Sequence, residues 1–314
     1  MTITDNCVQE IKRTFQQAKE RENGTVYIHL RSEHFAKHPI TADATKDMLH
    51  TIEREAEQIP RRDKLKLELS LPHIPCETEA ITALADNRIL TGLWVSGWNG
   101  DEDIISFANA LPENSQLTSI EIRDSEIGDA GARALAQLSH ITDVSLDNNS
   151  IGILGLTALA NTTHIIELGL SANEIDDEGA KILARNKHFK GLYLENNNIG
   201  DNGAIALAQG THAKEVTLMQ NSIGNAGAVA LAQNKRIREL FLDNNKVGDS
   251  GALAFLKNRK LECLDLDNNP ISPEVRRQVD IWERKREVAT DRKEMVADAA
   301  ANLFRLLKGS KQYA

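Results

Sequence analysis

Apolar residues recur along the middle of the chain, from Leu117 to Ile271, with a period of 24 residues through seven copies. The first apolar position of each copy is occupied by Leu117, Ile141, Ile165, Phe189, Ala213, Ile237 and Leu261. Ile120 and Ile122 follow in the first copy with a polar residue between them, and this alternation predicts a short strand. The second half of each copy is rich in small and apolar residues, which suits a short helix. Each copy is therefore predicted to contain one strand and one helix.

Three further columns keep the same period. The asparagine column comprises Asn149, Asn173, Asn197, Asn221, Asn245 and Asn269, with Ser125 in the first copy. The glycine column comprises Gly131, Gly155, Gly179, Gly203, Gly227 and Gly251. The aspartate column comprises Asp129, Asp177, Asp201 and Asp249. We expect each of these aspartates to cap the first free amides of the helix in its own copy.

The pattern resembles a known repeat. The stretch "IRELFLDNNKVGDSGALAFL" (237–256) resembles the leucine-rich repeat, L-x-x-L-x-L-x-x-N-x-L. The stretch "NNNIGDNGAIALAQ" (196–209) is similar to a phrase of the ribonuclease-inhibitor-like class, and the short, regular copies also look like leucine-rich-repeat effectors of intracellular bacteria. The resemblance implies an α/β solenoid shaped as a curved horseshoe, with parallel strands on the concave face and helices on the convex face. It also implies that the asparagine amides hydrogen-bond the backbone of adjacent turns.

The residues before the regular copies are predicted to begin the same solenoid. Residues 1–24 are interpreted as an N-terminal helical cap, because apolar residues recur there at helical spacing, at Val8, Ile11, Phe15 and Ala18. Residues 25–116 are interpreted as three divergent repeats, whose alternating strands lie at about 25–30, 65–71 and 90–95. The alternative is that these residues form a separate small α/β cap.

Residues 117–271 are the regular repeats, and residues 272–314 are predicted to form a C-terminal helical cap. Ser272 is placed to cap a helix that begins at Pro273. Apolar residues then line one face of that helix, at Val275, Val279 and Trp282, and we expect this face to cover the last repeat. A second amphipathic stretch at 291–308 either completes the cap or contacts a partner or a membrane.

Composition narrows the setting of the protein. Three cysteines lie far apart, which favours a reducing compartment over a disulfide framework. No secretory signal and no apolar run long enough to span a membrane is evident. The net charge of −9 argues against nonspecific binding of nucleic acid. We expect a monomer that is cytoplasmic, or that is secreted without a classical signal into the cytosol of a host cell.

The sequence contains no motif of a catalytic, metal or cofactor site, so we predict a protein that is not an enzyme. One histidine column stands directly before the strands, at His140, His164, His188 and His212, and it continues as Arg236 and Lys260. Such a column is either a metal-binding or acid-sensing ladder or a set of cations near helix C-termini. The replacement of histidine by arginine and lysine favours the second interpretation. Repulsion between stacked imidazoliums would lower their pKa values, whereas helix carbonyls would raise them.

The residues between the apolar strand positions are predicted to line the concave face. Ten of these 21 positions in the seven regular copies are acidic and one is basic. Our candidate partner-binding residues on this face are Trp94, Asp147, Glu167, Tyr193, Glu195, Glu215, Met219, Glu239, Phe241 and Asp243. Aromatic residues among charges are a common composition of interface hot spots. The alternative is that the acidic residues only keep an open surface soluble.

These observations predict a non-enzymatic protein-protein interaction module that binds a basic protein partner through its concave face. Regulation of a GTPase, as by activators of the Ran-directed type that share this repeat class, is the alternative function.

Overall fold

The computed structural model describes residues 5–19, 25–30, 40–59, 66–71, 76–112 and 115–286. Strands and helices alternate along the chain, and the strands form one parallel ten-stranded sheet in sequence order. The strands are β1 (Thr25–His29), β2 (Lys66–Ser70), β3 (Gly92–Ser96), β4 (Ser119–Arg123), β5 (Asp143–Ser145), β6 (Glu167–Gly169), β7 (Gly191–Tyr193), β8 (Glu215–Thr217), β9 (Glu239–Phe241) and β10 (Cys263–Asp265).

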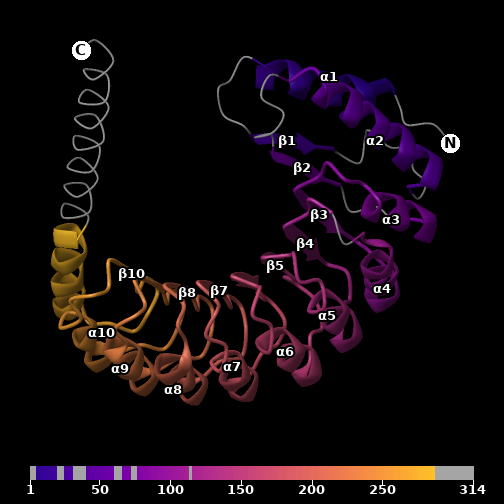
Figure 1. The fold of residues 1–314 in the computed structure, drawn as a ribbon. Coiled ribbons are helices and arrows are strands. Elements are labelled where there is room, and N and C mark those ends of the chain that lie inside the picture. The colour runs from indigo at the N-terminus through magenta and orange to yellow at the C-terminus, as the bar shows by residue number, and fades with distance from the viewer. Residues whose placement is uncertain are drawn as a thin grey trace, which may run out of the picture.

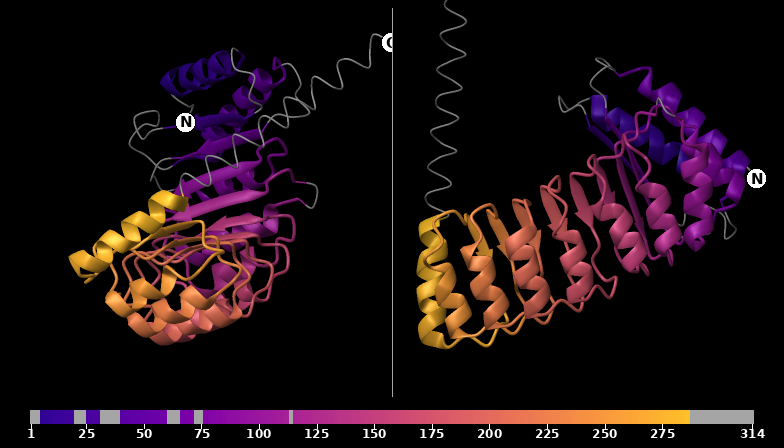
Figure 2. Two further views of the ribbon diagram at one scale, coloured as in Figure 1. Left: turned by 90° about the vertical axis from the view of Figure 1, so that its left-hand side faces the viewer. Right: turned by 60° about the horizontal axis from the view of Figure 1, so that its bottom comes forward.

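The helices cover the outer side of the curved sheet (Figure 1) and stack side by side along it (Figure 2). They are α1 (Asp5–Lys19), α2 (Ala42–Ala56), α3 (Thr78–Ala85), α4 (Gly100–Ala110), α5 (Asp129–Leu135), α6 (Ile153–Ala160), α7 (Asp177–Leu183), α8 (Asp201–Gly210), α9 (Asn225–Gln233) and α10 (Asp249–Phe255), followed by a helix over 273–286. The predicted horseshoe solenoid, with strands on the concave face and helices on the convex face, is confirmed.

The strands of the divergent N-terminal repeats continue the same sheet. β3 pairs with β4 in register, with Gly92 opposite Ser119, and β1 and β2 extend the sheet beyond β3. α1 packs against α2 and β1 through its buried residues Cys7, Ile11 and Phe15. The division of residues 25–116 into divergent repeats stays a prediction.

The core consists of the apolar columns, because each repeat contributes the same positions to the space between sheet and helices. In the repeat that begins at Phe189, that residue, Leu192 and Leu194 from the strand side are buried, as are Ile199 from the turn and Leu207 from the helix. A single repeat would leave this set exposed on both sides, so the stacking of neighbours completes the core.

The asparagine column joins each repeat to the preceding one, as the resemblance implies. The Asn197 side chain donates to the Leu170 carbonyl of the preceding repeat at 3.0 Å. Its carbonyl oxygen accepts from the Asn173 and Ile175 amides at 3.1 and 2.8 Å. The residue before it, Asn196, has a φ of 52°, a left-handed conformation that turns the chain out of the sheet. Buried backbone groups at this bend are thereby satisfied between repeats.

The aspartate column caps the helix of the following repeat, and our expectation that it caps its own helix was wrong. Asp201 accepts from the Gly224 and Gly227 amides at the start of α9, at 2.8 and 2.7 Å. Asp177 bonds the start of α8 in the same way. Each aspartate is the first residue of its own helix, one position beyond the N-cap residue. Its carboxylate therefore reaches the helix stacked beside it.

One repeat departs from this rule and compensates for the departure. The aspartate column is occupied by Ile153 in α6, so no carboxylate comes from that position to the start of α7. Asp176 stands where Gly152 and Gly200 precede the helices of neighbouring repeats, and it accepts from the Glu178 and Gly179 amides at 3.1 and 3.0 Å. α7 is thus capped by its own N-cap residue.

The Asp176→Gly substitution should lower the free energy of unfolding by a few tenths of a kcal/mol, because the amides at the start of α7 lose their side-chain acceptor. Adding Ile153→Asp should recover most of this loss, since the new carboxylate would stand in the aspartate column. Urea unfolding of the two single variants and the double variant measures the coupling. The control pairs Asp176→Gly with Leu154→Asp, which places the same charge at an adjacent, exposed position. Equal stability of the two double variants would contradict the capping rule.

The helix over 273–286 covers the end of the solenoid, as the sequence predicts. Val275, Val279 and Trp282 are buried. The Arg286 guanidinium lies 5.0 Å from the centre of the Trp282 ring and donates to the Asn258 carbonyl at 3.2 Å. The stretch 291–308, for which we left capping and partner contact open, lies outside the described residues.

The Trp282→Ala substitution should destabilise the protein by about 3 kcal/mol, because removing a large buried ring leaves a cavity against the last repeat. Ile281→Ala is the matched control on the same helix, since Ile281 is 53% exposed, and it should change stability by less than about 0.5 kcal/mol. Chemical denaturation followed by circular dichroism measures both. Similar effects of the two substitutions would show that this helix does not seal the core.

Candidate binding surface

The strand register aligns the outward side chains of the concave face in rows. The central row contains Trp94, Glu121, Ser145, Gly169, Tyr193, Thr217, Phe241 and Asp265. The first row contains Gly92, Ser119, Asp143, Glu167, Gly191, Glu215, Glu239 and Cys263. At the ends of the strands, the 24-residue period continues with a third row of Arg123, Asp147, Ser171, Glu195, Met219, Asp243 and Asp267.

The three aromatic residues that we selected do not form one cluster. Trp94 lies four strands from Tyr193, which corresponds to about 19 Å at about 4.8 Å per strand. Trp94 instead stacks on Tyr27 of β1, with the ring centres 5.9 Å apart. The Tyr27 side chain is 55% exposed. We did not select it from the sequence, although its place between the inward residues Val26 and Ile28 indicates that it points outward.

Tyr193 is engaged with its acidic neighbours. Its hydroxyl donates to the Glu167 carboxylate at 3.1 Å. Gly191 lies on the same strand as Tyr193, opposite Glu167 in the first row, and the hydrogen bond passes over it. Burial and the charges of Glu167 and Glu215 raise the pKa of Tyr193, so it stays protonated and can donate. Phe241 lies two strands further along the central row.

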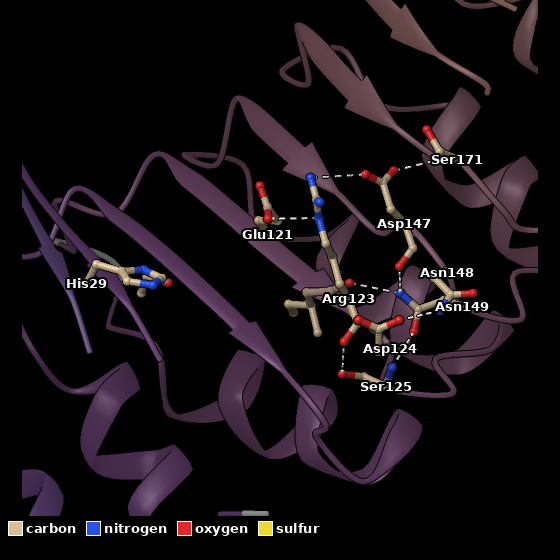
Figure 3. A network of polar contacts seen from close by, with 11 residues as sticks. His29, Glu121, Arg123, Asp124, Ser125, Asp147, Asn148, Asn149 and Ser171 are labelled. Atoms are coloured by element: carbon tan, nitrogen blue, oxygen red, sulfur yellow. Dashed lines mark hydrogen bonds and ion pairs between the residues drawn. The ribbon is translucent and has the colours of Figure 1, made fainter. Parts of the chain in front are cut away.

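We use the name acidic face for the ten carboxylates on the outward positions of β4 to β10 and of the residues that follow them. These are Glu121, Asp143, Asp147, Glu167, Glu195, Glu215, Glu239, Asp243, Asp265 and Asp267. The one basic residue among these positions, Arg123, contacts the carboxylates of Glu121 at 2.8 Å and Asp147 at 3.3 Å (Figure 3). Asp147 also accepts from the Ser171 amide at 2.9 Å.

Several carboxylates of the acidic face are costly to ionise in the folded protein. Burial raises the pKa of Glu167, and the charges of Asp143 and Glu215 raise it further. The hydrogen bond from Tyr193 lowers this pKa and offsets part of the increase. Burial also raises the pKa of Glu121, and burial together with neighbouring carboxylates raises the pKa of Glu239. The folded protein therefore holds negative charges closer together and with less hydration than the unfolded chain does.

A hollow of about 290 Å³ opens in the acidic face on β4 to β7. Its lining includes Ser145 and Gly169, which are small residues of the central row, with Glu121 on one side and Tyr193 on the other. Sequence reasoning missed this hollow. The signal was present, because two consecutive copies carry serine and glycine where later copies carry tyrosine, threonine and phenylalanine.

The histidine column lies in different surroundings along the stack. Burial lowers the pKa of His140, and burial with the charge of His140 lowers the pKa of His164, while His188 is exposed. This direction is the one that repulsion and burial predict.

Among the described residues, no group of three or more histidine, cysteine, aspartate or glutamate side chains is arranged to hold a metal ion. No helix in that same part of the chain has the length and apolar character to cross a membrane.

Comparison with known proteins agrees with this architecture. A family model described as "Leucine Rich repeat" matches residues 113–136, 162–184, 185–208, 233–256 and 257–274. The matched repeats and the single open parallel sheet define a leucine-rich-repeat solenoid. Leucine-rich repeats indicate a protein-protein interaction module, since solenoids of this kind present an extended concave surface to their partners.

Solved structures similar to this chain include a plant ice-binding protein, at 19% sequence identity with a TM-score of 0.42. That match covers 60% of each chain, so this protein spans 60% of the length of the ice-binding protein. They also include an internalin from Listeria monocytogenes, at 18% identity with a TM-score of 0.41, covering 85% of this chain and 90% of that one. Among curated proteins, a sequence search found no match.

The Glu167→Gln substitution should raise the melting temperature by about 1–2 °C at pH 7.5, a fraction of 1 kcal/mol. A carboxylate whose folded pKa is raised destabilises the fold when it is ionised, and the amide keeps an acceptor for Tyr193. The gain should shrink as the pH falls towards 4.5, because the wild-type carboxylate takes up a proton in the folded state first. Calorimetry at both pH values measures this, with Glu174→Gln, at an exposed position before α7, as the control. A lower melting temperature of Glu167→Gln at pH 7.5 would contradict the assignment.

Proposed function

We propose that the acidic face binds a protein partner with a basic surface, without catalysis. The observation that carries this proposal is the concentration of carboxylates on the concave face despite their cost there. A solenoid with strand and helix in every repeat, which is typical of the ribonuclease-inhibitor-like class, offers this face as its continuous surface. The similarity of the short repeats to bacterial effectors remains a prediction from sequence.

The charges favour binding over solubility as their role. Acidic residues that only keep a surface soluble are most effective where water hydrates them fully. Burial instead raises the pKa values of Glu121 and Glu167. A cationic partner would offset the repulsion between these carboxylates when it binds. Stability that is given up at such positions is characteristic of functional surfaces.

The aromatic residues divide the face into two regions. Tyr193 and Phe241 lie within the acidic face on β7 and β9, with Thr217 between them in the central row. Trp94 and Tyr27 form a second aromatic surface near the N-terminal end, on β3 and β1. We assign the main contact to Tyr193, Phe241 and Met219 with the surrounding acids. Trp94 reaches the same partner only if the partner spans several more strands.

The partner is to be captured from cell lysates with three forms of the protein. These are the wild type, the concave variant Glu195→Lys with Glu239→Lys, and a control variant, Glu102→Lys with Glu178→Lys, which carries the same charge change on the exposed surfaces of α4 and α7. Proteins retained by the wild type and by the control variant but lost from the concave variant qualify as partners.

The association rate of such a partner with the concave variant should be several-fold lower at low salt and should approach the wild-type rate at high salt, because exposed charges act mainly through screened, long-range attraction. Tyr193→Ala with Phe241→Ala should instead weaken affinity by about 2 kcal/mol at every salt concentration. Stopped-flow and titration measurements on folded variants separate the two effects. A partner whose binding is the same for all the variants would show that the acidic face is not the interface.

A further inference from the structure

The hollow on β4 to β7 exists because the central row carries Ser145 and Gly169 between the larger side chains of Glu121 and Tyr193. On the far side of the hollow, Gly191 leaves the space in which the Tyr193 hydroxyl meets the Glu167 carboxylate. The hollow is thus a recess with a floor of small residues and a wall formed by an aromatic side chain.

The charge of this recess is strongly negative. Five carboxylates line it, from Glu121, Asp143, Asp147, Glu167 and Glu195, against the single guanidinium of Arg123. The Arg123 guanidinium already forms ion pairs with two of these carboxylates, with Glu121 at 2.8 Å and with Asp147 at 3.3 Å. Asp143 and Glu167 stand opposite each other on adjacent strands in the first row, away from that guanidinium.

The Tyr193 side chain stands beside the first-row carboxylates, because its hydroxyl donates to Glu167 at 3.1 Å. The recess therefore offers two carboxylates and the Tyr193 side chain to a single cationic group.

We propose that the hollow receives one arginine side chain of the basic partner, an inference that rests on the proposed function. The volume of about 290 Å³ lies at the lower end of ligand pockets, which suits one long side chain. A planar guanidinium pairs with a carboxylate through two parallel N–H groups, keeps further N–H groups for a second acceptor, and packs against an aromatic ring. A lysine ammonium is a point charge and gains less from this geometry.

The test uses two probes, a hexa-arginine peptide and a single blocked residue, Nα-acetylarginine amide. Amide chemical shifts from NMR locate the binding of the single residue, and titration measures both affinities. The blocked arginine should shift the amides of Ser145, Gly169 and Gly191. The corresponding blocked lysine should bind about threefold to tenfold more weakly, and blocked citrulline, which has the same shape without the charge, should not bind measurably.

Gly169→Leu fills the hollow without a change of charge. It should weaken binding of the blocked arginine by at least about tenfold and of hexa-arginine by a similar factor. Cys263→Leu on β10 places the same side chain on the concave face outside the hollow and should leave both affinities unchanged. If Gly169→Leu fails to fold, Asp143→Asn with Glu167→Gln removes the two first-row charges while keeping the shape, and it should give the same loss.

Each contrary outcome has a distinct meaning. Unchanged binding of blocked arginine by the filled or neutralised variant overturns the arginine recess. Equal binding of lysine and arginine overturns the guanidinium assignment. In both cases, the proposed function would stay intact if the wild type binds hexa-arginine and the variant Glu195→Lys with Glu239→Lys does not. Failure of hexa-arginine to bind the wild type would count against both proposals.

Discussion

The structure depends on a buried asparagine amide that satisfies the backbone of two repeats at once. The chain must turn out of the sheet after every strand, and this turn would leave buried amides and carbonyls without partners. Asn197 accepts from amides of the preceding repeat and donates to one of its carbonyls. Each repeat therefore completes the hydrogen bonding of the one before it. The aspartate column works in the other direction, because Asp201 caps the helix of the repeat that follows.

This mutual dependence fixes the register of the sheet, and the register in turn builds the surface. Strands that cannot slip place every outward residue beside its counterparts in the neighbouring repeats. A substitution in one copy consequently alters one defined place in a row. Serine and glycine at positions 145 and 169 open a hollow, while Tyr193 in the next copy forms its wall.

The columns inside the repeat and the rows outside it are subject to different constraints. Inward positions are nearly uniform because each must fill the same space and satisfy the same backbone groups. Outward positions vary in size, and they collect carboxylates whose pKa values burial raises. Such charges oppose folding, so the structural columns have to stabilise the solenoid well enough to tolerate them. The acidic face is in this sense supported by the asparagine and aspartate columns beneath it.

The sequence by itself determined the repeat, the order of strand and helix, the buried columns and the acidic character of the concave face, because these follow from local periodicity. Only the tertiary structure decided which groups meet across repeats. It directed the aspartates to the next helix, let Asp176 compensate for Ile153, paired Trp94 with Tyr27, and joined Tyr193 to Glu167. These contacts depend on the spacing and curvature of the stack. A one-dimensional pattern states which residues share a row, whereas distances along and between rows arise only when the repeats are packed.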